Sequence, residues 1–208
     1  MENELIRKSA AVLAGKLNVY TGREGLDFTK MVLGMEVMII NVTKLIIIYL
    51  LAAIMGVVAQ TAVLHIAFCV AKRHSFGLHA LNSTVCTIVS CTLFVIVPWA
   101  VYGLGFGIGN AAVLTAFTAI LLCLYKYAPA DTKARPLVGK KLRARLKRNA
   151  VICGVLLLAV ALRVPNNGVK LLITLGAAFQ CVAILPISYK LLKRSVRNYE
   201  NYEHTNAV

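Results

Sequence analysis

A histidine and a cysteine, His79 and Cys86, stand seven residues apart between two apolar segments of the chain. A thiol becomes a good nucleophile when a base takes its proton, and histidine can act as that base. Lys72, Arg73 and His74 precede the pair, and their positive charge also favours the thiolate. We therefore predict that His79 and Cys86 form a catalytic pair at the edge of a membrane-embedded body. The alternative is that they are two ordinary residues at a membrane interface.

The geometry of a helix limits how this pair can meet. On one unbroken helix the two side chains would share a face but lie about 10.5 Å apart along the axis, too far for a hydrogen bond. We therefore predict a helix break at Asn82-Ser83, with Ser83 as the N-cap of a helix that continues to Val101. Cys86 would be the third residue of that helix, where the helix dipole favours thiolate. Gly77 would permit the close approach that His79 needs.

The composition indicates an integral membrane protein. Of 208 residues, 59% are hydrophobic and 15% are charged, and the mean hydropathy of +0.76 exceeds that of soluble domains. The formal net charge is +15, but the cations stand at the ends of apolar segments. There they set topology and contact anionic lipid, so nucleic acid is not an expected partner. The six cysteines lack metal-ligand spacing, and we expect neither a metal nor a cofactor.

The apolar segments predict an all-α, polytopic membrane bundle of about six spans, with five as the alternative. Residues 1–30 are expected to form amphipathic helices at the membrane surface. Residues 31–71 are too long for one span and should cross twice, with a turn near Gly56. Four further spans are predicted at 85–101, 107–124, 150–162 and 171–192, the last interrupted by Pro186.

Basic residues predict the orientation of these spans. The cations at Lys72-Arg73, in the 126–148 loop and from Lys190 onward should all be cytoplasmic. The number of spans between these clusters agrees with this assignment, which leaves only Arg163 and Lys170 outside. A basic N-terminal arm is also cytoplasmic if residues 31–71 cross twice. The main alternative is a single crossing there, with the N-terminus outside.

Four blocks of sequence follow one another along residues 31–190. They are Leu33-Gly34-Met35-Glu36 with Lys44-Leu45-Ile46, then Lys72-Arg73 through Gly77-Leu78-His79-Ala80 to Cys86, then Tyr127-Ala128-Pro129-Ala130-Asp131-Thr132 to Pro136, and finally the basic run Lys140 to Arg148. Together they resemble the accessory gene regulator B (AgrB) family of membrane cysteine endopeptidases. The interval from His79 to Cys86 matches the catalytic pair of that family. Phe76 departs from it, because many members have a glycine there.

The resemblance implies a substrate and a reaction. The substrate would be an AgrD-like quorum-sensing propeptide with an acidic C-terminal tail, which Cys86 would remove through an acyl-enzyme while His79 moves the proton. A Cys or Ser of the peptide would then close a thiolactone or lactone ring. The resemblance also implies a homodimer in the bacterial cell membrane, with the catalytic residues on the cytoplasmic side. The competing hypothesis is a small transporter or channel without covalent chemistry, which would tolerate replacement of Cys86.

A domain division follows from these predictions. Residues 1–30 would be a cytoplasmic arm, residues 31–192 the membrane-embedded peptidase domain, and residues 193–208 a cytoplasmic tail. The peptidase domain would include a catalytic segment at 72–90 and a basic cytoplasmic loop at 126–148. A basic cytoplasmic face attracts an acidic tail, and the predicted contacts are Arg143, Arg145, Lys147 and Arg148. The alternative is that these cations only set orientation. We interpret Asp131 as a loop cap and leave it out of the catalytic set.

Overall fold

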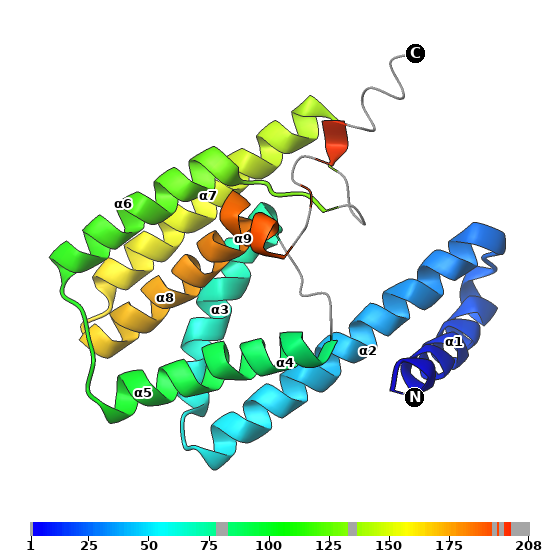
Figure 1. Cartoon of the computed structure of the whole chain (residues 1–208), viewed down its shortest axis with the longest axis horizontal. Helices are drawn as coiled ribbons and strands as arrows, with labels where there is room; N and C mark the ends of the chain where they lie inside the picture. The colour runs from blue at the N-terminus through cyan, green and yellow to red at the C-terminus, as the bar shows by residue number, and fades with distance from the viewer. Residues whose placement is uncertain (1, 78–82, 133–136, 193–194, 196–197, 201–208) are drawn as a thin grey trace. The chain divides into compact units, whose positions relative to one another are not determined.

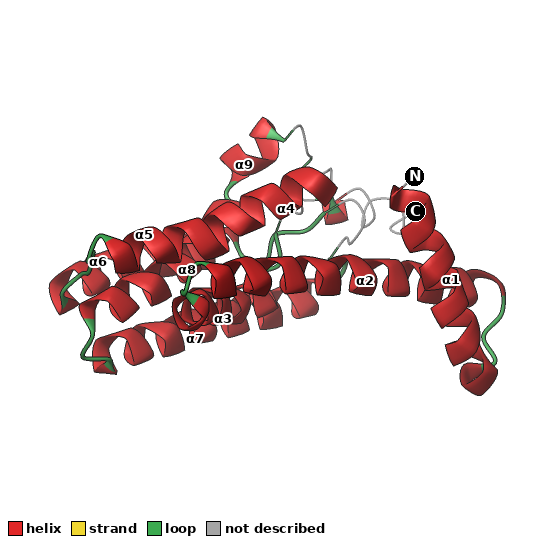
Figure 2. Ribbon diagram, turned by 90° about the horizontal axis from the view of Figure 1, so that it is seen from below, coloured by secondary structure: helices red, strands yellow, loops and turns green. Residues whose placement is uncertain are grey.

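The computed structural model describes residues 2–77, 83–132, 137–192, 195 and 198–200, most of which are helical (Figures 1 and 2). Phe76 and Ala130 form an isolated β-bridge, and none of the described residues belongs to a β-strand. The predicted all-α class is therefore confirmed. The chain divides into two compact units, Met1–Leu51 and Ala52–Val208, and each is described by itself.

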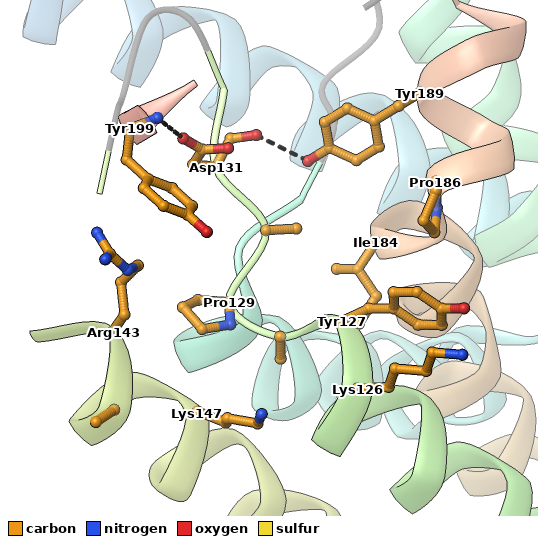
Figure 3. A pocket seen from close by; sticks show the side chains of 13 residues that line it. Lys126, Tyr127, Pro129, Asp131, Arg143, Lys147, Ile184, Pro186, Tyr189 and Tyr199 are labelled. Atoms are coloured by element: carbon orange, nitrogen blue, oxygen red, sulfur yellow. Dashed lines mark hydrogen bonds between the residues drawn. The ribbon is translucent and has the colours of Figure 1, made fainter. Parts of the chain in front are cut away.

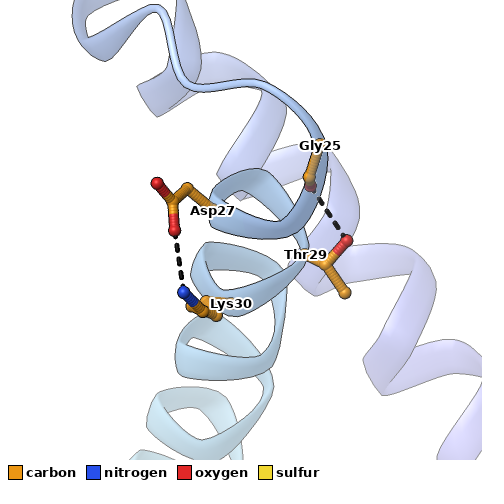
Figure 4. Close-up of polar contacts among 4 residues, drawn as sticks. All are labelled: Gly25, Asp27, Thr29 and Lys30. Carbon is orange, nitrogen blue, oxygen red and sulfur yellow. Dashed lines mark hydrogen bonds and ion pairs between the residues drawn. The ribbon is translucent and has the colours of Figure 1, made fainter.

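The first unit consists of two helices joined by a short turn, and the second of these helices extends past the unit boundary: α1 (Glu2–Thr21) and α2 (Gly25–Ile54). Near the start of α2, Lys30 pairs with Asp27 of the first turn at 2.9 Å (Figure 4). The Thr29 hydroxyl donates to the Gly25 carbonyl at 3.2 Å. These local contacts suit a helix start, where an acid opposes the positive end of the dipole. The helical arm is thus present, whereas its amphipathic placement on a membrane surface stays a prediction.

Residues 31–71 belong to two helices, α2 and α3 (Val58–Ser75). Gly56 has a φ of +70° and lies in the turn between them, as predicted. The apolar helix begins earlier than expected, at Gly25 instead of Met31.

A second long helical stretch has three parts: α4 (Ser83–Cys91), η1 (Thr92–Ile96) and α5 (Val97–Gly103). The middle part is a π-turn, and Pro98 follows it after one residue, as the second residue of α5. Proline has no N–H to continue the regular hydrogen-bond ladder, which explains a local change of winding at this point. The Phe94 ring packs against His65 and Phe68 of α3, with ring centroids 4.7 Å and 5.2 Å apart.

The core of the second unit is formed by α3 and three more helices, which lie side by side in Figure 1: α6 (Asn110–Tyr127), α7 (Lys140–Arg163) and α8 (Asn167–Ile184). Their buried apolar side chains, such as Phe117 and Leu157, form one cluster. Gly176 of α8 lies so close to α3 that a Cβ there would stand 2.5 Å from the Leu64 carbonyl oxygen. Small residues at such contacts let helix backbones approach closely.

The two ends of this unit differ in charge. At one end the α5–α6 and α7–α8 connections meet, where the Ile108 N–H donates to the Asn167 carbonyl at 3.1 Å. At the other end the last turn of α3 meets the α6–α7 connection and the junction between α8 and α9 (Pro186–Leu191). We call this second end, formed by residues 72–77, 126–132, 137–148 and 184–191, the basic end. The predicted cytoplasmic cations of this unit that the structure describes, except those after residue 191, are gathered there.

Four segments among the described residues are long and apolar enough to cross a membrane, which supports a membrane protein: Gly25–Ile54, Thr84–Gly103, Asn110–Tyr127 and Asn167–Ile184. The count of six spans is therefore not confirmed. The apolar part of α3 is shortened by Lys72 and Arg73 in its last turn, and that of α7 by the basic residues at its start. The predicted interruption at Pro186 is present, because α8 ends at Ile184 and Pro186 begins α9.

Candidate functional site

Cys86 lies in the first turn of α4, which begins at Ser83, within one residue of the predicted start. Its thiol is free and the residue is half-buried. Side chains on a helix tilt toward its N-terminus, where unpaired backbone N–H groups and the positive end of the dipole stabilise an anion. His79 lies outside the described residues. The predicted pairing of the two side chains therefore stays a prediction.

α3 ends at Ser75, so a helix end stands before His79. The predicted helix start at Ser83 is present, and Asn82 lies outside the described residues. Phe76 has a φ of +56° and Gly77 a φ of +111°, in a region that favours glycine over residues with a Cβ. This backbone explains why glycine suits the position that Phe76 occupies. At Gly77 a Cβ would also lie 3.0 Å from the Ala183 carbonyl oxygen, so close approach is a second reason for glycine.

Hydrogen bonds from two distant segments hold this turn. The Gly77 N–H donates to the Ala130 carbonyl at 3.1 Å, and the Ala130 N–H donates to the Ser75 carbonyl at 2.9 Å. From α8, the Gln180 amide donates to the Phe76 carbonyl at 2.5 Å and to the Ser75 hydroxyl at 2.7 Å. Gln180 is fully buried. The segment that leads to His79 is thus fixed by α8 and by the Tyr-Ala-Pro-Ala block at 127–130.

A cavity of about 540 Å³ lies at the basic end (Figure 3). Its walls come from the end of α6, the 128–131 loop, the first turns of α7, the α8–α9 junction and the C-terminal segment. The charged and aromatic residues in the lining are Lys126, Tyr127, Asp131, Arg143, Lys147, Tyr189 and Tyr199.

Three cations and several tyrosines give this cavity its character. Arg143 lies over the Tyr199 ring at 3.9 Å from the centroid, Lys147 over Tyr125 at 4.5 Å, and Lys126 over Tyr127 at 5.3 Å. Within the described part of the chain, neither lysine forms an ion pair with a carboxylate. The cavity therefore presents positive charge beside aromatic surface.

Asp131 is the acidic residue of the lining, and its carboxylate accepts hydrogen bonds from backbone N–H groups. One oxygen accepts from the Asn198 N–H at 3.1 Å and the other from the Tyr199 N–H at 2.8 Å. Asp131 is 4% exposed. A buried carboxylate that accepts two backbone N–H groups acts as a cap. The sequence interpretation of Asp131 as a loop cap was therefore right, although its partners lie in the C-terminal segment.

Tyr189 of α9 is the other buried polar anchor of the cavity. Its hydroxyl donates to the Asp131 carbonyl at 3.0 Å. Burial, with a further contribution from the Asp131 carboxylate, raises the pKa of Tyr189 to about 12. The phenol therefore keeps its proton at neutral pH and remains a donor.

The structure separates the four predicted substrate contacts into two pairs. Arg143 and Lys147 are four residues apart on α7 and both line the cavity. Arg145 and Arg148 are exposed on the same helix and are not among the described residues of the lining. Sequence reasoning did not single out Lys126 or the tyrosines. Lys126 directly precedes the Tyr-Ala-Pro-Ala block, which was the one available signal.

Comparison with known proteins identifies the family of this chain. The model of the AgrB family, accessory gene regulator B, matches residues 6–184. The chain is 40% identical over 204 residues to a putative AgrB-like protein of Clostridium acetobutylicum, covering 98% of this chain and 97% of that protein. It is 40% identical over 199 residues to a putative AgrB-like protein of Listeria innocua, covering 96% of each.

A relative with a shorter alignment carries the family name itself. This is the accessory gene regulator protein B of Staphylococcus intermedius, 32% identical over 183 residues, which cover 88% of this chain and 95% of that protein. No solved structure matches the chain. Because the family match and the relatives extend over nearly the whole chain, this protein belongs to the accessory gene regulator B family, which implies a role in accessory gene regulator quorum sensing.

Proposed function

We propose that this protein is a membrane cysteine endopeptidase that removes the C-terminal tail of an AgrD-like propeptide and promotes cyclisation of the signal peptide. One observation carries the proposal. The hydrogen-bonded turn at 75–77 precedes His79 in the chain, and Cys86 lies in the first turn of α4. A fixed turn before the base and a helix N-terminus at the thiol both suit a Cys–His pair.

The chemistry follows from these two side chains. His79 takes the proton of the Cys86 thiol, and the sulfur attacks the carbonyl carbon at the junction with the tail. His79 then gives that proton to the leaving amine, so the tail departs and a thioester remains. A Cys or Ser side chain of the peptide attacks the thioester, closes the ring and releases Cys86. Backbone N–H groups at the start of α4 are the proposed oxyanion donors.

The acidic tail of the substrate would bind in the cavity at the basic end. Arg143, Lys147 and Lys126 supply positive charge, and the neighbouring tyrosines supply apolar surface for the side chains between acids. Such a concave site with a few charged groups is typical of specific binding. Arg145 and Arg148 remain proposed contacts outside the cavity, where their charge would attract the tail at longer range.

The proposal extends to the setting of the enzyme. The proposed enzyme has a cytoplasmic arm at 1–30, a peptidase domain at 31–192 and a cytoplasmic tail at 193–208. It also includes a homodimer, anionic lipids around the basic residues, and catalytic residues on the cytoplasmic side of the bacterial membrane. The exposed apolar side chains of the candidate spans, such as Ile46 and Leu122, suit a lipid environment.

Mass spectrometry of a co-expressed precursor tests this function. The precursor would be an AgrD-like peptide, ideally the one encoded beside this gene, expressed with the parent protein, Cys86→Ala or His79→Ala. Cys91→Ala is the matched control, because Cys91 is also a half-buried free thiol on α4. The parent and the control should remove the tail and yield a product lighter by one water than the linear signal fragment.

The two catalytic variants should leave the precursor intact while they accumulate in the membrane at the parent level. Tail removal by Cys86→Ala would refute the endopeptidase proposal. The transporter hypothesis would then gain, since a transporter tolerates the loss of that thiol.

A further inference from the structure

The C-terminal segment at 198–200 forms part of the cavity wall. Its two consecutive N–H groups, those of Asn198 and Tyr199, both bind the buried Asp131 carboxylate. Asn198 is 2% exposed, and its side-chain amide also donates to the Ser195 carbonyl at 2.9 Å. The segment is therefore docked through specific polar contacts and not only by apolar packing.

This docking places an aromatic ring on a cavity cation. The Arg143 guanidinium carbon lies 3.9 Å from the centroid of the Tyr199 ring. A second contact fixes the same guanidinium, because one of its N–H groups donates to the Leu137 carbonyl at 2.9 Å. A planar guanidinium that is stacked on one face and hydrogen-bonded at one edge loses little freedom when it binds a carboxylate.

We propose that the C-terminal segment is a structural part of the substrate site. Tyr199, docked by Asp131, acts as a positioning residue that holds Arg143 ready to receive a carboxylate of an acidic peptide. This inference rests on the proposed function only in taking the acidic tail as the ligand of the cavity. It adds residues from outside the membrane-embedded body to the determinants of substrate affinity.

Peptide binding without turnover tests the inference. The full-length Cys86→Ala protein in detergent would be titrated against a fluorescein-labelled peptide of alternating Glu and Leu, with fluorescence anisotropy as the readout. The same peptide with Gln in place of Glu is the charge control. Tyr199→Ala should raise the Kd for the acidic peptide about threefold to tenfold, the loss expected for one cation–π contact. Tyr199→Phe keeps the ring and should bind as the parent does.

Two further variants separate positioning from general damage. Asp131→Asn should also weaken binding, because its side-chain oxygen can accept from one N–H while its amide opposes the other. In the Arg143→Ala background, Tyr199→Ala should cause no further loss, since the ring acts through Arg143. Equal thermal unfolding of the parent, Tyr199→Ala and Tyr199→Phe shows that the fold is intact.

Four outcomes would overturn the inference. Unchanged binding by Tyr199→Ala, or additive losses in the double variant, would mean that the ring does not act on Arg143. Tighter binding of the acidic peptide by Tyr199→Ala would mean that the C-terminal segment competes with the peptide. Equal binding of the Glu and Gln peptides by the parent would remove the cavity as an acidic site. None of these results depends on Cys86 chemistry, which the cleavage assay decides separately.

Discussion

Phe76 shows how single residues shape the approach to the predicted catalytic histidine. A non-glycine residue in this backbone region costs about 1–3 kcal/mol, and it persists only where its surroundings hold it. Here the holding contacts are identified: the backbone of Ala130 on one side and the amide of Gln180 on the other. Gln180 is therefore the side chain whose removal should most directly loosen the turn.

We predict that Gln180→Leu slows tail removal strongly and leaves acidic-peptide binding within about twofold of the parent. Leucine is apolar and cannot donate, so the Phe76 carbonyl and the Ser75 hydroxyl lose a buried partner. Each such loss costs about 1–3 kcal/mol. Single-turnover cleavage and peptide anisotropy measure the two effects. Gln60→Leu is the control, because it makes the same change near the opposite end of α3. Equal slowing by both variants would indicate a general loss of packing.

Sequence reasoning located some of these residues and not others. Ser83 was recognisable as a helix start because N-cap preferences act through neighbouring residues. Gln180 was not recognisable, since its partners Ser75 and Phe76 lie more than 100 residues earlier in the chain. The same holds for Tyr199, which reaches Asp131 across 68 residues. Polar side chains whose role depends on distant backbone groups carry no local signature.

At the scale of elements, α9 is attached to the cavity loop through Tyr189. Its folded-state pKa of about 12 lies above the ordinary value of 10.0. A raised pKa means that the folded state holds the proton more tightly than the unfolded state. The resulting stability is complete below pH 10 and is lost as the pH rises toward 12.

The prediction compares the parent with Tyr189→Phe. Below pH 10 the parent should be more stable, because the variant lacks the hydrogen bond to the Asp131 carbonyl, worth about 1 kcal/mol. Between pH 10 and 12 this advantage should shrink, while the other titrating groups affect both proteins alike. Thermal unfolding midpoints at steps of pH measure the difference. A constant gap over that range would show that Tyr189 does not titrate as described.

Element boundaries were predictable where breakers stand. Gly56 marks the turn after α2, because glycine frees the backbone to adopt a positive φ. Pro186 marks the interruption after α8, because proline restricts the backbone. The start of α2 at Gly25 was missed, since charged residues such as Asp27 and Lys30 looked like part of a surface arm. Their ion pair at i,i+3 instead supports the first turn of the helix. The π-turn before Pro98 also escaped prediction, because the apolar pattern continues through it.

At the scale of the whole molecule, charge separates the two ends of the second unit. The α5–α6 and α7–α8 connections lie at one end, and the α6–α7 connection and the α8–α9 junction lie at the other. The order of spans that the cations predicted stays a prediction, because two helices of this unit fall short of the apolar length. The orientation of the spans can be predicted from sequence, because it depends on where cations stand relative to apolar segments. The number of spans is harder to predict from sequence, since helices such as α7 combine a basic start with an apolar remainder.

The separation of charge predicts membrane orientation. Single cysteines would be placed at Lys141 in the basic end and at Leu104 near the other end, both exposed positions, in a background without the six native cysteines. A membrane-impermeant maleimide should label Leu104→Cys in intact cells, because few cations hold that end inside. It should label Lys141→Cys only after permeabilisation. The reverse pattern would place the basic cavity outside the cell, where it would not meet a propeptide before export.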